Sequence, residues 1–198
     1  YSGKRAYFPN NDSILAMGPA GVLYNWCAAV DTFNTTYGEL SAVSTAPNVV
    51  FNGHRQGICP EGWHIPTSDE YDELFVFINT DSTNRCNNTD GSIAKALASE
   101  EGWAVSYSSC TPGNAPNSNN SSDLSIYPSE FNSSGLGTRC NLICANQNGQ
   151  NNTWGRSISN NYATVYGAIN AKSYGLTVRC LRDTPSGYTI YFRPNGGA

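Results

Sequence analysis

The most regular pattern of apolar and polar positions lies between residues 57 and 79. Residues 63–65, Trp-His-Ile, follow a Pro-Glu-Gly turn and precede a proline, which predicts a short buried strand. Thr67 and Glu70 then have the spacing of a helix capping box, and apolar residues recur at intervals of three and four. The pattern predicts a helix from Thr67 to about Asn79, whose apolar face carries Tyr71, Leu74, Phe75 and Ile78.

Other apolar segments predict a few more short elements. Residues 21–31 have the pattern of a strand followed by a short helix, and residues 92–99 that of a second helix begun by Asp90 or Ser92. Segments 162–169 and 174–183, separated by a turn, predict a hairpin. Further short strands are predicted at Val49–Phe51 and Tyr188–Phe192. The length suits one domain, residues 1–183, and a C-terminal tail, residues 184–198, that adds a strand or begins another module.

The segment 106–161 has almost no periodicity and is dominated by Asn, Ser, Gly and Thr. In isolation this composition is typical of disorder. Apolar residues and three cysteines are nevertheless spread through it, so we expect a long ordered loop region. Such loops are usually functional, and we expect binding chemistry here.

The charge content is low, and this narrows the classes of partner. Only 13% of residues are charged, the formal net charge is -4, and 24 residues are asparagine. No basic stripe is present that would neutralise a row of phosphates, so nucleic acid is not an expected partner. The sequence has no apolar stretch long enough to span a bilayer, and we expect no direct membrane insertion.

Seven cysteines lie at positions 27, 59, 86, 110, 140, 144 and 180, without the paired C-x-x-C spacing of zinc ribbons and redox sites. A disulfide framework is the better interpretation, and it implies an oxidising, extracellular compartment. The odd number leaves one thiol over. Cys27 is the expected one, because it lies in the apolar run LYNWCAAV, where a small buried hydrophobic residue is sufficient.

Four segments together resemble a known family. They are GVLYNW (21–26), ICPEGWHIPTSDEYDEL (58–74), KALASEEGW (95–103) and SYGLTVRCLRD (173–183). Over residues 20–183 the chain resembles the Fibrobacter succinogenes major paralogous domain, which is abundant in surface and secreted proteins of gut Bacteroidetes. The resemblance implies an α+β, C-type-lectin-like fold, in which two helices flank a small twisted antiparallel sheet with a long irregular loop region. It also implies a domain that binds rather than catalyses.

The resemblance extends to one cysteine pair. In the implied fold the first and last strands run side by side, which places Cys59 against Cys180. The other five cysteines are not features of the family, and six cysteines allow 15 connectivities. Pairings of Cys86 with Cys110 and of Cys140 with Cys144 are our guesses. The chain departs from the family where Trp154-Gly155-Arg156-Ser157 replaces paired tryptophans and serines, and where Tyr71 replaces a tryptophan in the helix.

No catalytic motif is present, and the protein is not expected to be an enzyme. Of the two histidines, His54 and His64, the second lies in the predicted strand and is interpreted as a hydrogen-bonded core residue. An enzyme of the formylglycine-generating type, with Cys140 and Cys144 as catalytic thiols, is a weaker alternative because no basic neighbour would lower their pKa. The loop 81–91 offers oxygen ligands but fits no calcium-binding pattern, so we expect no metal and no cofactor.

The segment 146–174 is the best candidate for a binding surface. Tyrosine and tryptophan rings supply flat apolar faces there, and asparagine amides both donate and accept hydrogen bonds. Paratopes and saccharide sites use this combination. Tyr162 and Tyr166 have equal strand parity and are expected to face the same way. The predicted ligand-binding residues are Asn151, Asn152, Trp154, Arg156, Asn160, Asn161, Tyr162, Tyr166, Asn170 and Tyr174.

We therefore expect an extracellular, surface-displayed binding module, such as an adhesin, that recognises a protein or a glycan on another cell or surface through residues 106–174. Every residue of 157–171 is accessible to retroelement-driven changes of asparagine codons, so hypervariability is a further hypothesis. A structural subunit of a surface filament, assembled through the strand Tyr188–Phe192, is the main alternative.

Overall fold

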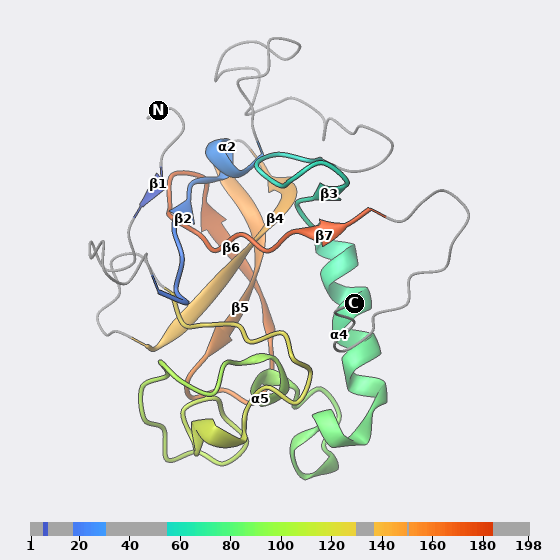
Figure 1. The fold of residues 1–198 in the computed structure, drawn as a ribbon, viewed down its shortest axis with the longest axis vertical. Helices are drawn as coiled ribbons and strands as arrows, with labels where there is room; N and C mark the ends of the chain where they lie inside the picture. Colours follow the sequence, from blue (N-terminus) through green and yellow to red (C-terminus); the bar gives the residue numbers. More distant parts are fainter. Residues whose placement is uncertain (1–5, 8–17, 31–54, 130–136, 150, 184–198) are drawn as a thin grey trace.

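A three-stranded antiparallel sheet forms the centre of the computed structural model, which describes residues 6–7, 18–30, 55–129, 137–149 and 151–183. Its strands are β4 (Arg139–Asn148), β5 (Asn152–Ser159) and β6 (Tyr166–Ala171), in the order β4-β5-β6 (Figure 1). Two smaller antiparallel pairs join β1 (Ala6–Tyr7) to β2 (Leu23–Tyr24) and β3 (Trp63–His64) to β7 (Leu181–Arg182).

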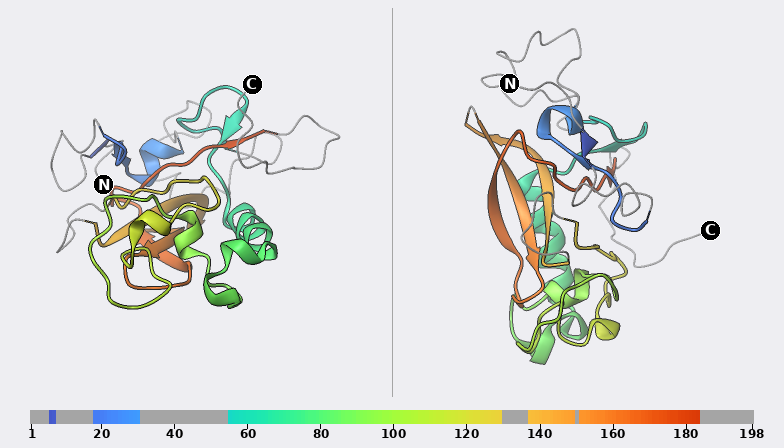
Figure 2. Two further views of the ribbon diagram at one scale, coloured as in Figure 1. Left: turned by 60° about the horizontal axis from the view of Figure 1, so that its bottom comes forward. Right: turned by 90° about the vertical axis from the view of Figure 1, so that its left-hand side faces the viewer.

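The helices of the described part are α2 (Trp26–Ala29), α4 (Ser68–Thr80) and α5 (Ala94–Leu97), with short 3-10 turns at Ser82–Asn84, Cys86–Asn88 and Pro116–Ser118. α4 lies beside the central sheet, while α5 and the irregular segment that follows it lie at one end of the sheet (Figures 1 and 2). The arrangement is a small α+β fold with few helices and small antiparallel sheets. None of the described helices has the length and apolar character needed to cross a membrane.

The predicted strand and helix around residue 65 are present. Thr67 is the N-cap of α4: its side chain accepts a hydrogen bond from the Glu70 amide, and the Glu70 carboxylate accepts one from the Thr67 amide. This capping box satisfies amides that the first turn leaves without helical partners. Tyr71 and Ile78 are buried on the predicted apolar face, with Leu74 and Phe75 packed partly buried beside them.

The strands β4 and β5 correct the prediction of a continuous loop over 106–161. Only its first part, up to residue 129, is irregular among the described residues, whereas 139–148 and 152–159 form the two longest strands. The alternation was hidden because β5 buries polar residues, including Thr153, Arg156 and Ser157, on both faces of the sheet. A strand with buried polar residues does not show the apolar periodicity by which strands are recognised.

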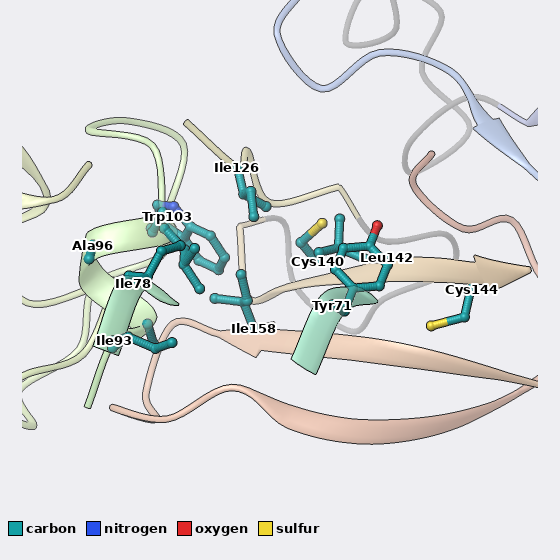
Figure 3. Packing of buried hydrophobic residues seen from close by; sticks show 13 residues of the cluster. Tyr71, Ile78, Ile93, Ala96, Trp103, Ile126, Cys140, Leu142, Cys144 and Ile158 are labelled. Atoms are coloured by element: carbon teal, nitrogen blue, oxygen red, sulfur yellow. The ribbon is translucent and has the colours of Figure 1, made fainter. Parts of the chain in front are cut away.

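The two faces of the sheet have different neighbours. One face carries Cys140, Leu142 and Ile158, which form the main core with Tyr71 and Ile78 of α4, as Figure 3 shows. The opposite face carries the intervening residues of each strand, because side chains alternate along a strand. These residues are Arg139, Asn141, Ile143, Ser157, Tyr166, Ala168 and Asn170. We call this second side of the sheet the open face.

A chain crossing partly covers the open face. After β6, residues 172–176 pass from that edge strand to the far side of β4, where the Thr177 amide donates to the Asn141 carbonyl and the Ile143 amide donates to the Thr177 carbonyl, each at 2.9–3.0 Å. Leu176 also exchanges two backbone hydrogen bonds with Tyr24, each of 2.9 Å. These bonds hold the crossing in place.

Three further predictions need correction. The segments 162–169 and 174–183 do not form a hairpin: β6 pairs with β5, and β7 pairs with β3. The second helix is only four residues long and begins after Ile93, because the Ser92 hydroxyl donates to backbone carbonyls of Cys86 and Thr89 instead of capping it. Trp63, expected in the core, is 38% exposed, since alternation in β3 turns His64 inward. The predicted strands Val49–Phe51 and Tyr188–Phe192 lie outside the described residues.

Two disulfide bonds are present, Cys59–Cys180 and Cys86–Cys110, as expected. Cys27 retains its thiol and is buried in the second core cluster with Trp26 and Ile65. The expected Cys140–Cys144 bond is absent, and both thiols are buried and free. The reason is geometric: four residues along a strand separate two Cα atoms by about 13 Å, whereas a disulfide requires roughly 4.4–6.8 Å. Figure 3 shows the two thiols at separate positions along β4.

His64 connects three parts of the fold. Its ring nitrogens lie 2.9 Å from Glu70 Oε1 in α4 and 2.6 Å from Asp183 Oδ1 after β7. Burial alone would lower the pKa of His64, but hydrogen bonds and charges from the two carboxylates outweigh burial and raise it. Burial likewise opposes ionisation of Glu70, yet the bonds to His64 and Thr67 lower the Glu70 pKa to about 2. The predicted core histidine therefore links strand and helix through hydrogen bonds, and its raised pKa favours the charged form.

This link gives a pH dependence with a definite sign. The contribution of His64 is complete below the unfolded pKa of 6.5 and is lost as the pH rises through the higher folded pKa. The contribution of Glu70 is present above 4.5 and is lost as the pH falls through about 2. We expect the cluster to stabilise the fold most between these ranges. Urea unfolding of wild type and His64→Gln across pH checks this: an alkaline decline of equal size in both proteins would contradict it.

Candidate functional site

A pocket of about 460 Å³ lies on the open face of the sheet, beside the crossing of residues 172–176. Its lining comes from all three strands of the central sheet and from the crossing. We call it the sheet pocket. The lining residues are Arg139, Asn141, Ser157, Tyr166, Ala168, Ile169, Asn170, Tyr174, Gly175 and Leu176.

The walls of the sheet pocket are fixed by main-chain hydrogen bonds. The floor strands are paired in register, with Asn141 opposite Ser157 and Ser157 opposite Tyr166. The crossing is held by the bonds of Leu176 and Thr177, and the Tyr174 amide donates to the Ala171 carbonyl at 2.9 Å. A site built on such backbone loses little conformational entropy when a ligand binds.

Two polar atoms at this pocket have no hydrogen-bond partner among the described residues. They are Ser157 Oγ and Asn170 Nδ2, both fully buried, and Ser157 as a residue is only 1% exposed. Buried polar groups in folded proteins are nearly always paired, so such atoms at a pocket indicate a missing partner. Gly155 gives the Asn170 amide its place: a Cβ on Gly155 would lie 2.7 Å from Asn170 Nδ2.

Two tyrosines, Tyr166 and Tyr174, line the pocket, and a third adjoins it. Tyr166 contacts Tyr162 edge to face, with ring centroids 6.0 Å apart. Tyr162 precedes β6, so the two rings meet through the turn before the strand and not through strand parity as predicted. Tyr174, on the crossing, is 59% exposed. Exposed tyrosines bring large contact areas with few rotatable bonds, which favours binding.

The electrostatics of the pocket are simple. Among the described residues that line it, Arg139 carries the only charge, and no carboxylate is present. The Asn170 amide nitrogen and the Arg139 guanidinium are hydrogen-bond donors, whereas the hydroxyl of Ser157 both donates and accepts. The lining therefore favours ligands rich in acceptor oxygens and disfavours cations.

The structure places the ten predicted residues in different surroundings. Tyr166, Asn170 and Tyr174 line the sheet pocket, and Tyr162 adjoins it. Asn151 and Asn152 lie at the β4–β5 turn, where the Asn151 carbonyl accepts from the Lys172 amide. The remaining four residues lie elsewhere: Trp154 on the opposite face of β5, Arg156 against α4, and Asn160 and Asn161 in the β5–β6 turn.

Several of the predicted residues have structural contacts, and the Asn161 side-chain oxygen accepts from the Ser159 hydroxyl at 2.8 Å. The Asn160 side chain donates to the Ala104 carbonyl at 3.2 Å. Arg156, 6% exposed, donates to Asp72 Oδ1 at 2.6 Å and to both the carbonyl and the hydroxyl of Ser68 at 2.8–2.9 Å. The Arg156 guanidinium thus connects β5 to the first turn of α4, on the side of the sheet away from the pocket.

Several pocket residues escaped the sequence argument, notably Arg139, Asn141 and Ser157. They come from β4 and β5, which the sequence did not reveal as strands. The sequence did contain a signal for these two strands. In the segments Arg139–Leu142 and Arg156–Ile158, polar residues lie between buried neighbours, and polar residues in such positions mark one face of a strand.

The other candidate groups have no features of a reactive or metal-binding site. Burial raises the pKa of Cys144 to about 12 and also raises that of Cys140. In the loop 81–91, Asp81 Oδ1 accepts from the amide and hydroxyl of Thr83, and Asn84 and Asp90 make hydrogen bonds to neighbouring segments. No group of three or more potential metal-ligating side chains occurs in the part of the chain that the structure describes.

The fold and pocket thus define a small disulfide-bonded α+β domain with a preformed pocket on one sheet face. The family comparison is consistent with the resemblance seen in the sequence: the model of the Fibrobacter succinogenes major domain matches residues 2–182, and the chain belongs to this family. Comparisons with curated proteins and with solved structures gave no significant match.

Proposed function

We propose that the domain is an extracellular binding module of the adhesin or receptor-binding type, with a C-type-lectin-like arrangement, displayed at a cell surface. It recognises a protein or a glycan on another cell or surface, and the sheet pocket with its tyrosines is the binding site. The observation that carries this proposal is the convergence of Tyr166, Asn170 and Tyr174 with the buried, unpartnered hydroxyl of Ser157 on one pocket.

The cysteine chemistry supports an extracellular module over a thiol enzyme. Two disulfides are typical of proteins that fold in an oxidising compartment. A catalytic thiol requires a lowered pKa and access to solvent. Cys140 and Cys144 are both fully buried, and burial raises the pKa of each.

An array of immobilised glycans and extracellular-matrix glycoproteins tests the proposed function. We expect the labelled full chain to bind a subset of the array, and Tyr174→Ala to weaken that binding about tenfold through lost aromatic contact. Tyr107→Ala is the matched control, because Tyr107 is 96% exposed and does not line the pocket. Equal binding by wild type and Tyr174→Ala would exclude the sheet pocket as the site.

Close relatives provide a second test, which needs no ligand. If the pocket faces variable partners, substitutions should concentrate at Tyr162, Tyr166, Ala168 and Asn170, within the segment accessible to asparagine-codon changes. If these positions are identical among close relatives, the hypothesis of hypervariability is wrong, and the pocket binds the same ligand in each relative.

A further inference from the structure

We propose that the sheet pocket seats a single saccharide residue through an oxygen-rich edge, with no metal ion, Ser157 and Asn170 reading that edge and Tyr174 covering the ring. This inference rests on the proposed function and narrows its ligand to one chemical class. It follows from the hydrogen-bonding capacity, the shape and the charge of the pocket.

The hydrogen-bonding capacity calls for acceptors on the ligand. Asn170 Nδ2 is a donor without a partner among the described residues, and it is held above Gly155. Ser157 lies two positions after Gly155 on the same face of β5, and its Oγ can donate or accept a hydrogen bond. A pyranose presents several hydroxyl and ring oxygens along one edge, and an ordered water can complete the bond to a deeply buried atom. An aliphatic side chain would leave both protein groups unpaired, at a cost in affinity.

The shape of the pocket favours one ring over an extended chain. About 460 Å³ lies within the range of small-ligand sites. The crossing at Tyr174–Leu176 closes one side, so a peptide strand has no continuous groove to follow through this pocket. Tyr174 is exposed at the rim, where its ring offers a flat apolar surface to the C–H face of a sugar.

The absence of carboxylates from the lining predicts a metal-independent site. Calcium binds through several oxygen ligands, carboxylates foremost among them. Among the described lining residues, the side chains that carry oxygen are uncharged: Asn141, Ser157, Tyr166, Asn170 and Tyr174. Recognition therefore occurs through hydrogen bonds, made directly or through an ordered water, and a chelator should leave it unchanged.

Neutral sugars and acidic sugars both satisfy this chemistry, and the charge of Arg139 distinguishes them experimentally. A neutral pyranose uses the Asn170 and Ser157 contacts alone, so its affinity should not depend on salt. The carboxylate of a uronic or sialic acid would be attracted by the positive charge of Arg139. Salt screens this attraction, so the affinity of an acidic sugar should fall as the salt concentration rises. Both outcomes support a saccharide site, and the salt dependence shows whether the sugar is neutral or acidic.

The experiment is a titration of the isotope-labelled full chain, followed by NMR through the side-chain amide of Asn170. The probes are methyl mannoside, methyl galactoside, N-acetylglucosamine, glucuronic acid and N-acetylneuraminic acid, each with and without EDTA. We expect at least one probe to shift this amide in both conditions. Ser157→Ala removes a hydroxyl that makes no bond in the described fold, so it should keep the fold and weaken that binding about tenfold.

The controls separate this inference from the proposed function. Tyr174→Ala should weaken binding about tenfold, while Tyr107→Ala should behave as wild type. If no probe shifts the Asn170 amide, or if EDTA abolishes the shift, the metal-free saccharide site is wrong. If in that case the chain still binds the protein part of a glycoprotein, and Tyr174→Ala weakens this binding, the proposed binding module is supported, with a protein as its ligand.

Discussion

Replacing Cys59 and Cys180 together by serine is expected to lower the free energy of unfolding by about 4–5 kcal/mol, the largest effect of any change considered. The bond joins residues 121 positions apart. In the chain-entropy account, a cross-link stabilises by restricting the unfolded chain, and the restriction grows with the length of the closed loop. The bond also lies beside the two-residue pair β3–β7, which the hydrogen bond between His64 and Asp183 supports as well.

Urea unfolding of the purified oxidised proteins measures this effect. The double variant Cys86→Ser with Cys110→Ser is the matched control, because its bond spans only 24 positions and should contribute about 3.5 kcal/mol. A larger loss from the shorter loop would show that local packing, and not loop entropy, sets the contribution of these bonds.

The second large effect is expected at Arg156. Substitution by alanine removes its hydrogen bonds to Ser68 and Asp72 and leaves a space between β5 and α4. We expect a loss of about 3 kcal/mol, because buried charge-assisted bonds and packing are lost together. The affinity of the sheet pocket for its ligand should be unchanged in the folded protein, since the guanidinium lies on the other side of the sheet.

Two controls define what the Arg156 result means. Asp72→Asn keeps an oxygen acceptor on a side chain that is 62% exposed, and should cost about 1 kcal/mol or less. Arg182→Ala, on the exposed surface of β7, should change stability by no more than about 0.5 kcal/mol. If Asp72→Asn costs as much as Arg156→Ala, the ion pair dominates and the bonds to Ser68 contribute little.

The sequence predicted the elements whose signals are local. Thr67 and Glu70 identify the start of α4 without reference to the rest of the chain, and the short helix after Asn25 follows from a few neighbouring residues. The pairing of β6 with β5 was not predictable in this way. Strand partners are chosen by contacts distant in sequence, so two adjacent alternating segments looked like a hairpin although each pairs elsewhere.

The candidate site was partly predictable for the same reason. Aromatic rings and amides close together in sequence identified Tyr166, Asn170 and Tyr174. Asn141 and Ser157 belong to the pocket because β4 and β5 lie next to β6. Their own segments could indicate a polar strand face, but not which strand lies beside it. Arg156 was misleading, since an arginine among polar residues resembles a binding group until the helix that packs against it is known.

The alternation of side chains along the central strands separates the residues that form the core from the residues that line the pocket. In β4, Leu142 belongs to the core while its neighbour Asn141 lines the pocket, and in β5 Ile158 and Ser157 are divided in the same way. Evolution can therefore exchange the residues that line the pocket to meet a new ligand while the intervening residues keep the fold. Insertion or deletion of a single residue in either strand would reverse the two sets, so the lengths of these strands are constrained more tightly than their compositions.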